Sequence, residues 1–189
     1  MGGMELGFAE TCQEKWRLLS HYFPSKLGGA PSWLSFNGVP DYESLKCDNC
    51  SKTCKFLLQI YSPDDDSVSC NNSTALTGDN SSYNQAYHRT VFLFVCDNSG
   101  CKKRTFKCFR SQLDRSNEFY SSAPPNDDYF DESVDYPKVE NHRTVCAVCY
   151  CTATKKCSGC GGVAYCSREH QTVHWKYEHK QRCKAIEGE

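Results

Sequence analysis

The chain has 189 residues, a formal net charge of −1 and 15 cysteines. The near-neutral charge gives no general attraction to nucleic acids or acidic membranes, and no run of about 18 apolar residues predicts a membrane-spanning helix. The first residues lack the basic and apolar regions of a secretory signal, so we expect reduced thiols. Cysteines paired at short spacing in such a chain indicate metal binding.

The first part of the chain is expected to hold a short helical run and a fixed loop. Trp16, Leu18 and Leu19 mark the helical run. Residues 23–34 contain two glycines and two prolines. These residues forbid a regular helix and favour a fixed loop beside a strand.

Three segments, 54–62, 88–96 and 104–110, are predicted as β-strands because apolar and aromatic residues recur in them. The second is apolar on both faces, which predicts a central strand, whereas the third alternates and should be half exposed. Residues 64–87, rich in Ser, Asn and Asp, are expected to form a mobile hairpin insertion.

Residues 121–141 are predicted to be an acidic linker that separates two modules. The segment contains the pair Pro124 and Pro125 and five acidic residues between 127 and 135. Proline and repeated negative charge disfavour packing, so we expect this stretch to connect rather than to fold.

Residues 142–184 carry four pairs of possible zinc ligands. The pairs are Cys146 and Cys149, Cys157 and Cys160, Cys166 and His170, and His179 and Cys183. They suffice for two tetrahedral sites, and side chains four residues apart lie on one face of a helix. About 40 residues with few large apolar groups cannot fold by burial alone. Zinc would supply the missing stability.

A competing assignment uses only part of this set. Cys157, Cys160, His174 and His179 nearly fit a DNA-reading finger. That choice leaves the remaining cysteines without partners.

The C-terminal module is also basic, which leaves weak nucleic-acid contact as a further interpretation, although nucleic acid is not the expected partner.

The order of the pairs resembles the MYND-type zinc finger, on residues 165–171 and 175–183. The sequence departs from it at His170, where most such fingers have Cys, and zinc accepts either ligand. The resemblance implies interleaved sites. One zinc would take Cys146, Cys149, Cys166 and His170, and the other would take Cys157, Cys160, His179 and Cys183. Cys151 and His174 are then bystanders.

The MYND resemblance also implies a surface for proline-containing peptides. Gln171 and Trp175 occupy the positions that dock such peptides in these fingers. Alternatively, Trp175 is the small core of the module.

A third zinc site is predicted before the linker. Cys47, Cys50, Cys96 and Cys101 bracket the first two strands, which suggests a zinc-ribbon-like site of four thiolates. Cys54 is a rival ligand. Cys12, Cys70 and Cys108 have no partner at useful spacing and are expected to be plain thiols.

Motifs along nearly the whole chain resemble the programmed cell death protein 2 family. They lie in residues 5–8, 23–34, 56–63, 88–96 and 109–120. The resemblance implies a dedicated chaperone for one small-subunit ribosomal protein, present in cytoplasm and nucleus. The family continues into a C-terminal domain that we expect this chain not to contain.

Together these features predict an α+β fold in three parts. Residues 1–120 form a β-rich N-terminal domain with the zinc-ribbon-like element, 121–141 the linker, and 142–184 the MYND finger. No catalytic motif is present, so we expect a non-enzymatic chaperone or adaptor in ribosome biogenesis, with two zinc ions in the finger and one more in the N-terminal domain. The alternative is a transcriptional co-regulator that docks proline-containing peptides.

Overall fold

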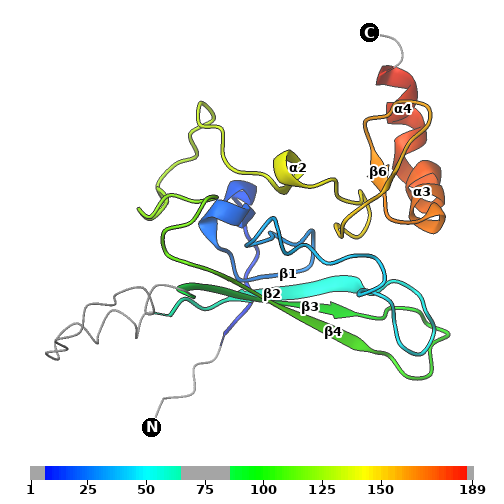
Figure 1. Ribbon diagram of the computed structural model, residues 1–189, viewed down its shortest axis with the longest axis horizontal. Helices are drawn as coiled ribbons and strands as arrows, with labels where there is room; N and C mark the ends of the chain where they lie inside the picture. The colour runs from blue at the N-terminus through cyan, green and yellow to red at the C-terminus, as the bar shows by residue number, and fades with distance from the viewer. Residues whose placement is uncertain (1–6, 65–85, 187–189) are drawn as a thin grey trace, which may run out of the picture.

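The computed structural model describes residues 7–64 and 86–186. Its main feature is a four-stranded antiparallel sheet in the order β1-β2-β3-β4 (Figure 1). The strands are β1 (Lys26–Leu27), β2 (Lys55–Tyr61), β3 (His88–Val95) and β4 (Phe106–Leu113).

Short helical elements and a two-stranded ribbon complete the described part. They are η1 (Lys15–Leu18), η2 (Ser20–Tyr22), α2 (Val139–His142), β5 (Lys155–Lys156), β6 (Ala164–Tyr165), α3 (Arg168–His174), η4 (Trp175–His179) and α4 (Lys180–Ile186). The predicted α+β class is confirmed. No helix in the described ranges is long and apolar enough to cross a membrane.

The three predicted strands are all present, and β3 lies between β2 and β4 as expected. β4 runs three residues beyond the predicted end at 110, because β3 pairs with it along its full length, from His88↔Leu113 to Val95↔Phe106. Its alternating exposure confirms the half-exposed strand. The insertion predicted at 64–87 falls almost entirely on residues 65–85, which lie outside the described residues.

One face of the sheet carries the core. His88, Thr90, Phe92 and Phe94 of β3 point to this face and are buried, whereas Val91 on the other face is 38% exposed. Loops cover the buried face (Figure 1). The loop residue Trp33 places its ring 4.7 Å from that of Phe92. The core is therefore built from one strand face and irregular chain.

The covering loop is held by a buried amide. Gln59 on β2 is 2% exposed. Its Oε1 accepts a hydrogen bond from the Ser32 backbone at 2.8 Å, and its Nε2 donates to the Pro24 carbonyl at 2.8 Å. A buried amide with both ends paired fixes its neighbours. The fixed loop predicted at 23–34 is thus confirmed, with the two-residue strand β1 inside it.

The segment predicted to be an unpacked linker does pack. Phe130 stacks on Trp16 at 6.1 Å between centroids, and Tyr136 stacks on His21 at 3.9 Å. Arg17 also donates to the carbonyl of Asp127 at 2.5 Å. The expectation was wrong because two aromatic rings bury against η1 and η2 despite the surrounding acidic residues.

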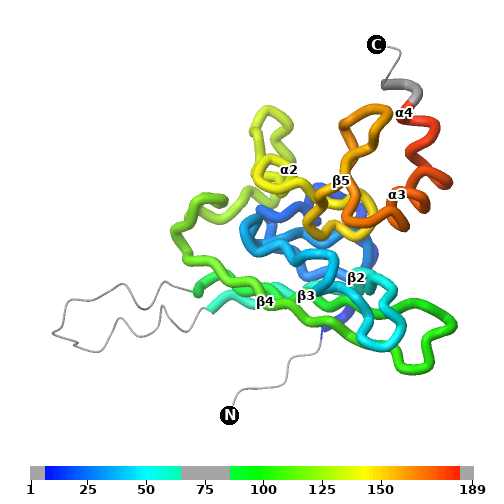
Figure 2. The backbone as a smooth tube through the Cα atoms, turned by 45° about the vertical axis from the view of Figure 1, so that its right-hand side comes forward, coloured from blue at the N-terminus to red at the C-terminus, as the bar shows by residue number. Residues whose placement is uncertain are grey.

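The C-terminal finger rests on the same core (Figure 2). The Trp33 indole donates to the Tyr150 carbonyl at 2.9 Å, and the Thr152 backbone donates to the Pro40 carbonyl at 2.9 Å. Buried cysteines of the finger belong to one hydrophobic cluster with Trp33 and Phe92. The predicted modules therefore share an interior. Their boundaries at 120 and 141 stay predictions.

Candidate metal centres

Three groups of four Cys or His side chains converge in the described part of the chain. In each group the donor atoms all lie within 4.8 Å of one another. The groups are Cys47, Cys50, Cys96 and Cys101; Cys146, Cys149, Cys166 and His170; and Cys157, Cys160, His179 and Cys183. All twelve predicted ligand residues are thus brought together in the predicted sets.

The distances within each group fit a tetrahedral zinc ion. Four sulfurs at the usual Zn–S distance would lie about 3.8 Å apart, and a sulfur and an imidazole nitrogen slightly closer. Two sulfur pairs in the N-terminal group are 3.9 Å and 3.6 Å apart. Among the sulfur–nitrogen pairs in the finger, Cys146–His170 and Cys160–His179 are 3.5 Å apart and Cys166–His170 is 3.2 Å apart. Each group is therefore capable of holding zinc.

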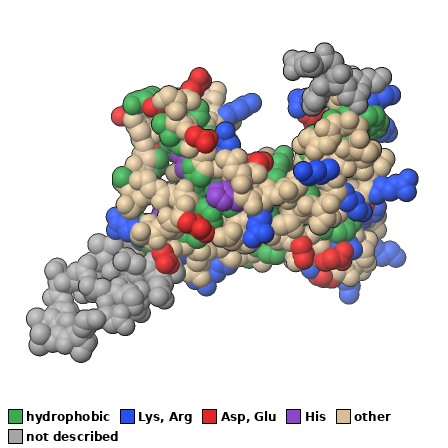
Figure 3. Space-filling view, turned by 45° about the horizontal axis from the view of Figure 1, so that its top comes forward, with side chains coloured by type: hydrophobic (Ala, Val, Ile, Leu, Met, Phe, Trp, Pro, Cys, Tyr) green, Lys and Arg blue, Asp and Glu red, His purple; other side chains and the backbone are tan. Residues whose placement is uncertain are grey.

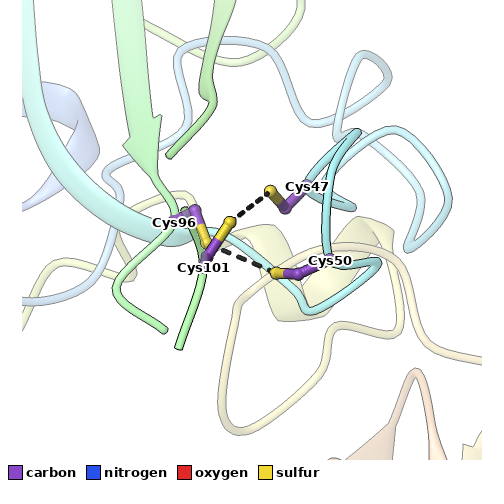
Figure 4. Close-up of side chains that lie close together, drawn as sticks. All are labelled: Cys47, Cys50, Cys96 and Cys101. Carbon is purple, nitrogen blue, oxygen red and sulfur yellow. Dashed lines mark hydrogen bonds between the residues drawn. The ribbon is translucent and has the colours of Figure 1, made fainter. Parts of the chain in front are cut away.

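The N-terminal centre joins the chain just before β2 to the chain just after β3. Cys47 and Cys50 come from the loop before β2, and Cys96 and Cys101 from the connection between β3 and β4. Figure 4 shows the four sulfurs pointing toward one another. Cys54, the rival ligand, is buried but is not among these four donors. Burial raises the pKa of its thiol to about 11, as expected of a packing cysteine.

The first finger centre joins a turn and a helix. Cys146 and Cys149 lie in the turn, and Cys166 and His170 flank the start of α3. Ser167 caps that helix, because its Oγ accepts a hydrogen bond from the His170 backbone at 3.2 Å. The cap fixes the first turn of α3, and in this turn the His170 imidazole faces the sulfurs of Cys146 and Cys166. The interleaved grouping implied by the MYND resemblance is what the structure has.

The second finger centre takes its histidine from a π-helical segment. His179 ends η4, and Cys183 follows one turn later in α4. Insertion of a wider π turn changes which face of the helix later residues occupy, and such turns are frequent at functional sites. His174 is outside the donor group. Its Nδ1 is 3.0 Å from the Tyr165 hydroxyl, which argues against the competing finger assignment.

Three cysteine turns share one backbone design. The amide of the first cysteine donates to a carbonyl five or six residues later, and the residue after the second cysteine donates back to the first. That residue has positive φ in every case: 58° at Ser51, 61° at Tyr150 and 64° at Gly161. This geometry places both sulfurs of each turn on one side, ready for a shared metal.

Neighbouring hydrogen-bond donors favour the thiolate form at several of these cysteines, among them Cys47 and Cys157. The Thr105 hydroxyl, 3.1 Å from the Cys47 sulfur, lowers the pKa of that thiol to about 5. Backbone hydrogen bonding from Cys160 lowers the pKa of the Cys157 thiol to about 6. Because zinc binds thiolate rather than thiol, these contacts reduce the cost of deprotonation. Nothing in the spacing of the cysteines pointed to Thr105.

The remaining cysteines divide into two kinds. Cys12 and Cys108 are exposed free thiols, as expected, and Cys70 lies outside the described residues. Cys151 is outside the four donors of the first finger centre, as expected of a bystander. It is nevertheless fully buried, and its sulfur is 3.1 Å from that of Cys149.

The predicted peptide-docking side chains lie on the helical arm of the finger. Trp175 is 38% exposed, whereas Tyr165 is fully buried beside Cys157 and Cys183. The aromatic core of the finger is therefore Tyr165 rather than Trp175. Peptide binding by Gln171 and Trp175 stays a prediction.

Comparisons with known proteins agree with this construction. The family described as "Programmed cell death protein 2, N-terminal domain" matches residues 3–127, and the family described as "MYND finger" matches residues 146–183. No solved structure matches the chain.

Two mammalian relatives extend the match along the chain. It is 40% identical over 184 residues to programmed cell death protein 2 of Bos taurus and 39% identical over 183 residues to that of Mus musculus. Each match covers 96% of this chain and 48% of the relative, so the chain spans about half the length of these proteins. The chain therefore belongs to the programmed cell death protein 2 family and carries a MYND zinc finger.

Proposed function

We propose that this protein is a non-enzymatic carrier that escorts a small-subunit ribosomal protein during ribosome biogenesis, in the cytoplasm and nucleus. Family membership and the zinc finger support a protein-interaction role. One observation favours a basic client: an apolar-walled cleft lies within an acidic segment of the chain.

The cleft has a volume of about 250 Å³ and lies between η2 and residues 119–137. Phe23, Phe119, Tyr120, Tyr136 and several prolines form its walls. A pocket of this kind fits the apolar part of a side chain or a proline from an extended segment.

The segment that lines the cleft is acidic. Asp135 lines the cleft itself, and the same segment carries Asp127, Asp128, Asp131 and Glu132, of which all but Asp131 are exposed. Figure 3 shows acidic and hydrophobic side chains side by side on this lobe, at the upper left. Ribosomal proteins are basic, and complementary charge steers such partners and disfavours others. An apolar pocket within an acidic segment suits a basic client segment that must be kept from RNA.

The test is binding of purified small-subunit ribosomal proteins to matched charge variants. Neutralising three exposed carboxylates of the acidic segment (Asp127→Asn, Asp128→Asn, Glu132→Gln) should weaken capture about tenfold or more at low salt and flatten its salt dependence. The matched control neutralises three exposed carboxylates elsewhere (Glu10→Gln, Asp114→Asn, Glu140→Gln) and should bind as the original chain does. Equal affinity of both variants, or no binding by the original chain, contradicts the proposal.

The second candidate function is a transcriptional co-regulator whose finger docks proline-containing peptides. The exposed ring of Trp175, four residues from Gln171, favours it. Trp175→Ala should abolish binding of such peptides and leave the zinc content unchanged. Tyr177→Ala, which removes a ring that is 76% exposed from the same helical arm, is the control. Unchanged peptide binding by the Trp175 variant eliminates this function.

A further inference from the structure

The three cysteine turns differ at one equivalent position. The residue two places after the second cysteine is Lys52 in the N-terminal turn, Cys151 in the first finger turn and Gly162 in the second. In the first two turns the carbonyl of this residue accepts a hydrogen bond from the first cysteine's amide, at 2.8 Å in both. The backbone therefore holds this position beside the metal centre, and Cys151 alone of the three places a thiol there.

The Cys151 side chain is directed at the first finger centre. Its sulfur is 3.1 Å from the Cys149 sulfur, closer than the 3.6 Å that separates Cys149 from Cys166, its fellow donor. The Cys151 side chain is fully buried among the finger cysteines. By contrast, Lys52 extends to the surface and pairs with Glu169 at 2.6 Å.

We propose that Cys151 is a reserve ligand of the first finger centre. Zinc there is held by Cys146, Cys166 and His170 together with either Cys149 or Cys151. Zinc takes four ligands in a structural site and prefers thiolate to water in the fourth position. A rotation of the Cys151 side chain, with no change in the backbone, brings its sulfur into the place that Cys149 leaves. Loss of the Cys149 thiolate, as in the substitution Cys149→Ser, then leaves a closed four-ligand site.

The three turns provide an internally controlled test. The full chain and the variants Cys149→Ser, Cys50→Ser and Cys160→Ser are purified without added metal, and zinc is counted by elemental analysis. We expect three zinc per chain in the original protein and in Cys149→Ser, and two in each of the other variants. The double variant Cys149→Ser/Cys151→Ser should also hold two. After cobalt substitution, the intensity of the thiolate-to-cobalt charge-transfer absorption, which scales with the number of coordinated thiolates, should be the same in Cys149→Ser as in the original chain.

Several outcomes overturn this assignment. One is loss of a zinc from Cys149→Ser alone, or its failure to fold when Cys50→Ser and Cys160→Ser fold. Another is retention of three zinc by the double variant or by all three single variants, since a substitute other than Cys151 would then fill the site.

A second measurement uses Cys151→Ser, which keeps every primary donor. This variant should release one of its three zinc ions to a competing chelator severalfold faster than the original chain does. Identical release kinetics in the two chains reject the reserve role.

Discussion

The indole nitrogen of Trp33 donates a hydrogen bond to the carbonyl oxygen of Tyr150, 2.9 Å away and 117 residues later in the chain. Trp33 lies in the loop that covers the sheet, and Tyr150 is the positive-φ residue of the first finger turn. The bond therefore links the buried face of the sheet to the backbone that shapes a zinc site. It makes the finger part of the same folded unit as the sheet.

Replacement of Trp33 by Phe should lower the free energy of unfolding by about 2–3 kcal/mol, because it leaves the Tyr150 carbonyl without its partner and opens a small cavity. Denaturant unfolding of the zinc-loaded chain measures this. Trp16→Phe is the control, since the Trp16 indole makes no hydrogen bond within the described ranges. Equal losses in the two variants would show that the bond contributes nothing.

Removal of zinc should disorder the finger and loosen the sheet's core together. Structural zinc contributes on the order of 10–16 kcal/mol per site in zinc-finger peptides, comparable to the whole stability of a domain. Because buried cysteines of the finger share a cluster with Trp33 and Phe92, a strong chelator should change the near-ultraviolet circular dichroism and tryptophan fluorescence. Added zinc should restore both signals. A chelated chain with unaltered spectra would refute the shared interior.

The positive φ of the cysteine turns predicts opposite effects at two equivalent positions. Ser51→Gly should stabilise the chain by about 1 kcal/mol, because glycine adopts this conformation without strain. Gly161→Ala should destabilise it by about 1–2 kcal/mol. An added Cβ there meets no atom within 4 Å, so the cost is conformational alone.

Gly162→Ala serves as the control for both, since Gly162 does not have positive φ and an added Cβ is in ordinary contact at 3.9 Å. The measurement is chemical unfolding at saturating zinc. A Gly161 variant as stable as the Gly162 variant would contradict the argument.

His21 should make stability depend on pH below neutrality. Burial lowers the pKa of its imidazole from 6.5 to about 4, and neither ring nitrogen has a hydrogen-bond partner among the described residues. Between these values the unfolded chain binds the proton and the folded chain does not, so the free energy of unfolding falls as pH drops from about 6.5 toward 4.

His21→Phe removes this proton while keeping a ring against Tyr22 and Tyr136, the two rings that contact it. Loss of zinc in acid affects both chains, so the informative quantity is their difference in unfolding free energy. That difference should shift in favour of the variant as pH falls. Parallel pH curves for the two chains would rule out the imidazole as the cause.

Spacing alone predicted the chemistry of the metal centres. Donors three to five residues apart in a turn or helix reach one ion regardless of the rest of the fold, which is why all twelve candidate donors were found from the sequence. The apolar run of β3 likewise predicted its central place, because side chains that are apolar on both faces are typical of a strand in the middle of a sheet.

Other features depended on which distant residues meet. No local pattern places Thr105 beside the sulfur of Cys47, or the rings of Phe130 and Tyr136 against η1 and η2. Cys151 is a different case: it was expected to be a bystander and lies only two residues from Cys149, yet the turn brings the two sulfurs to 3.1 Å.

The sequence by itself determined the ligand types, their pairing into turns and the strands that carry them, because these follow from short-range geometry. Only the tertiary structure decided that the finger shares a core with the sheet, that the acidic segment forms a cleft and that a fifth thiol adjoins the first finger centre. The first two contacts join residues far apart in the chain, and their free energy comes from burial and pairing that no local periodicity encodes. The position of Cys151 instead depends on the backbone conformation of one turn.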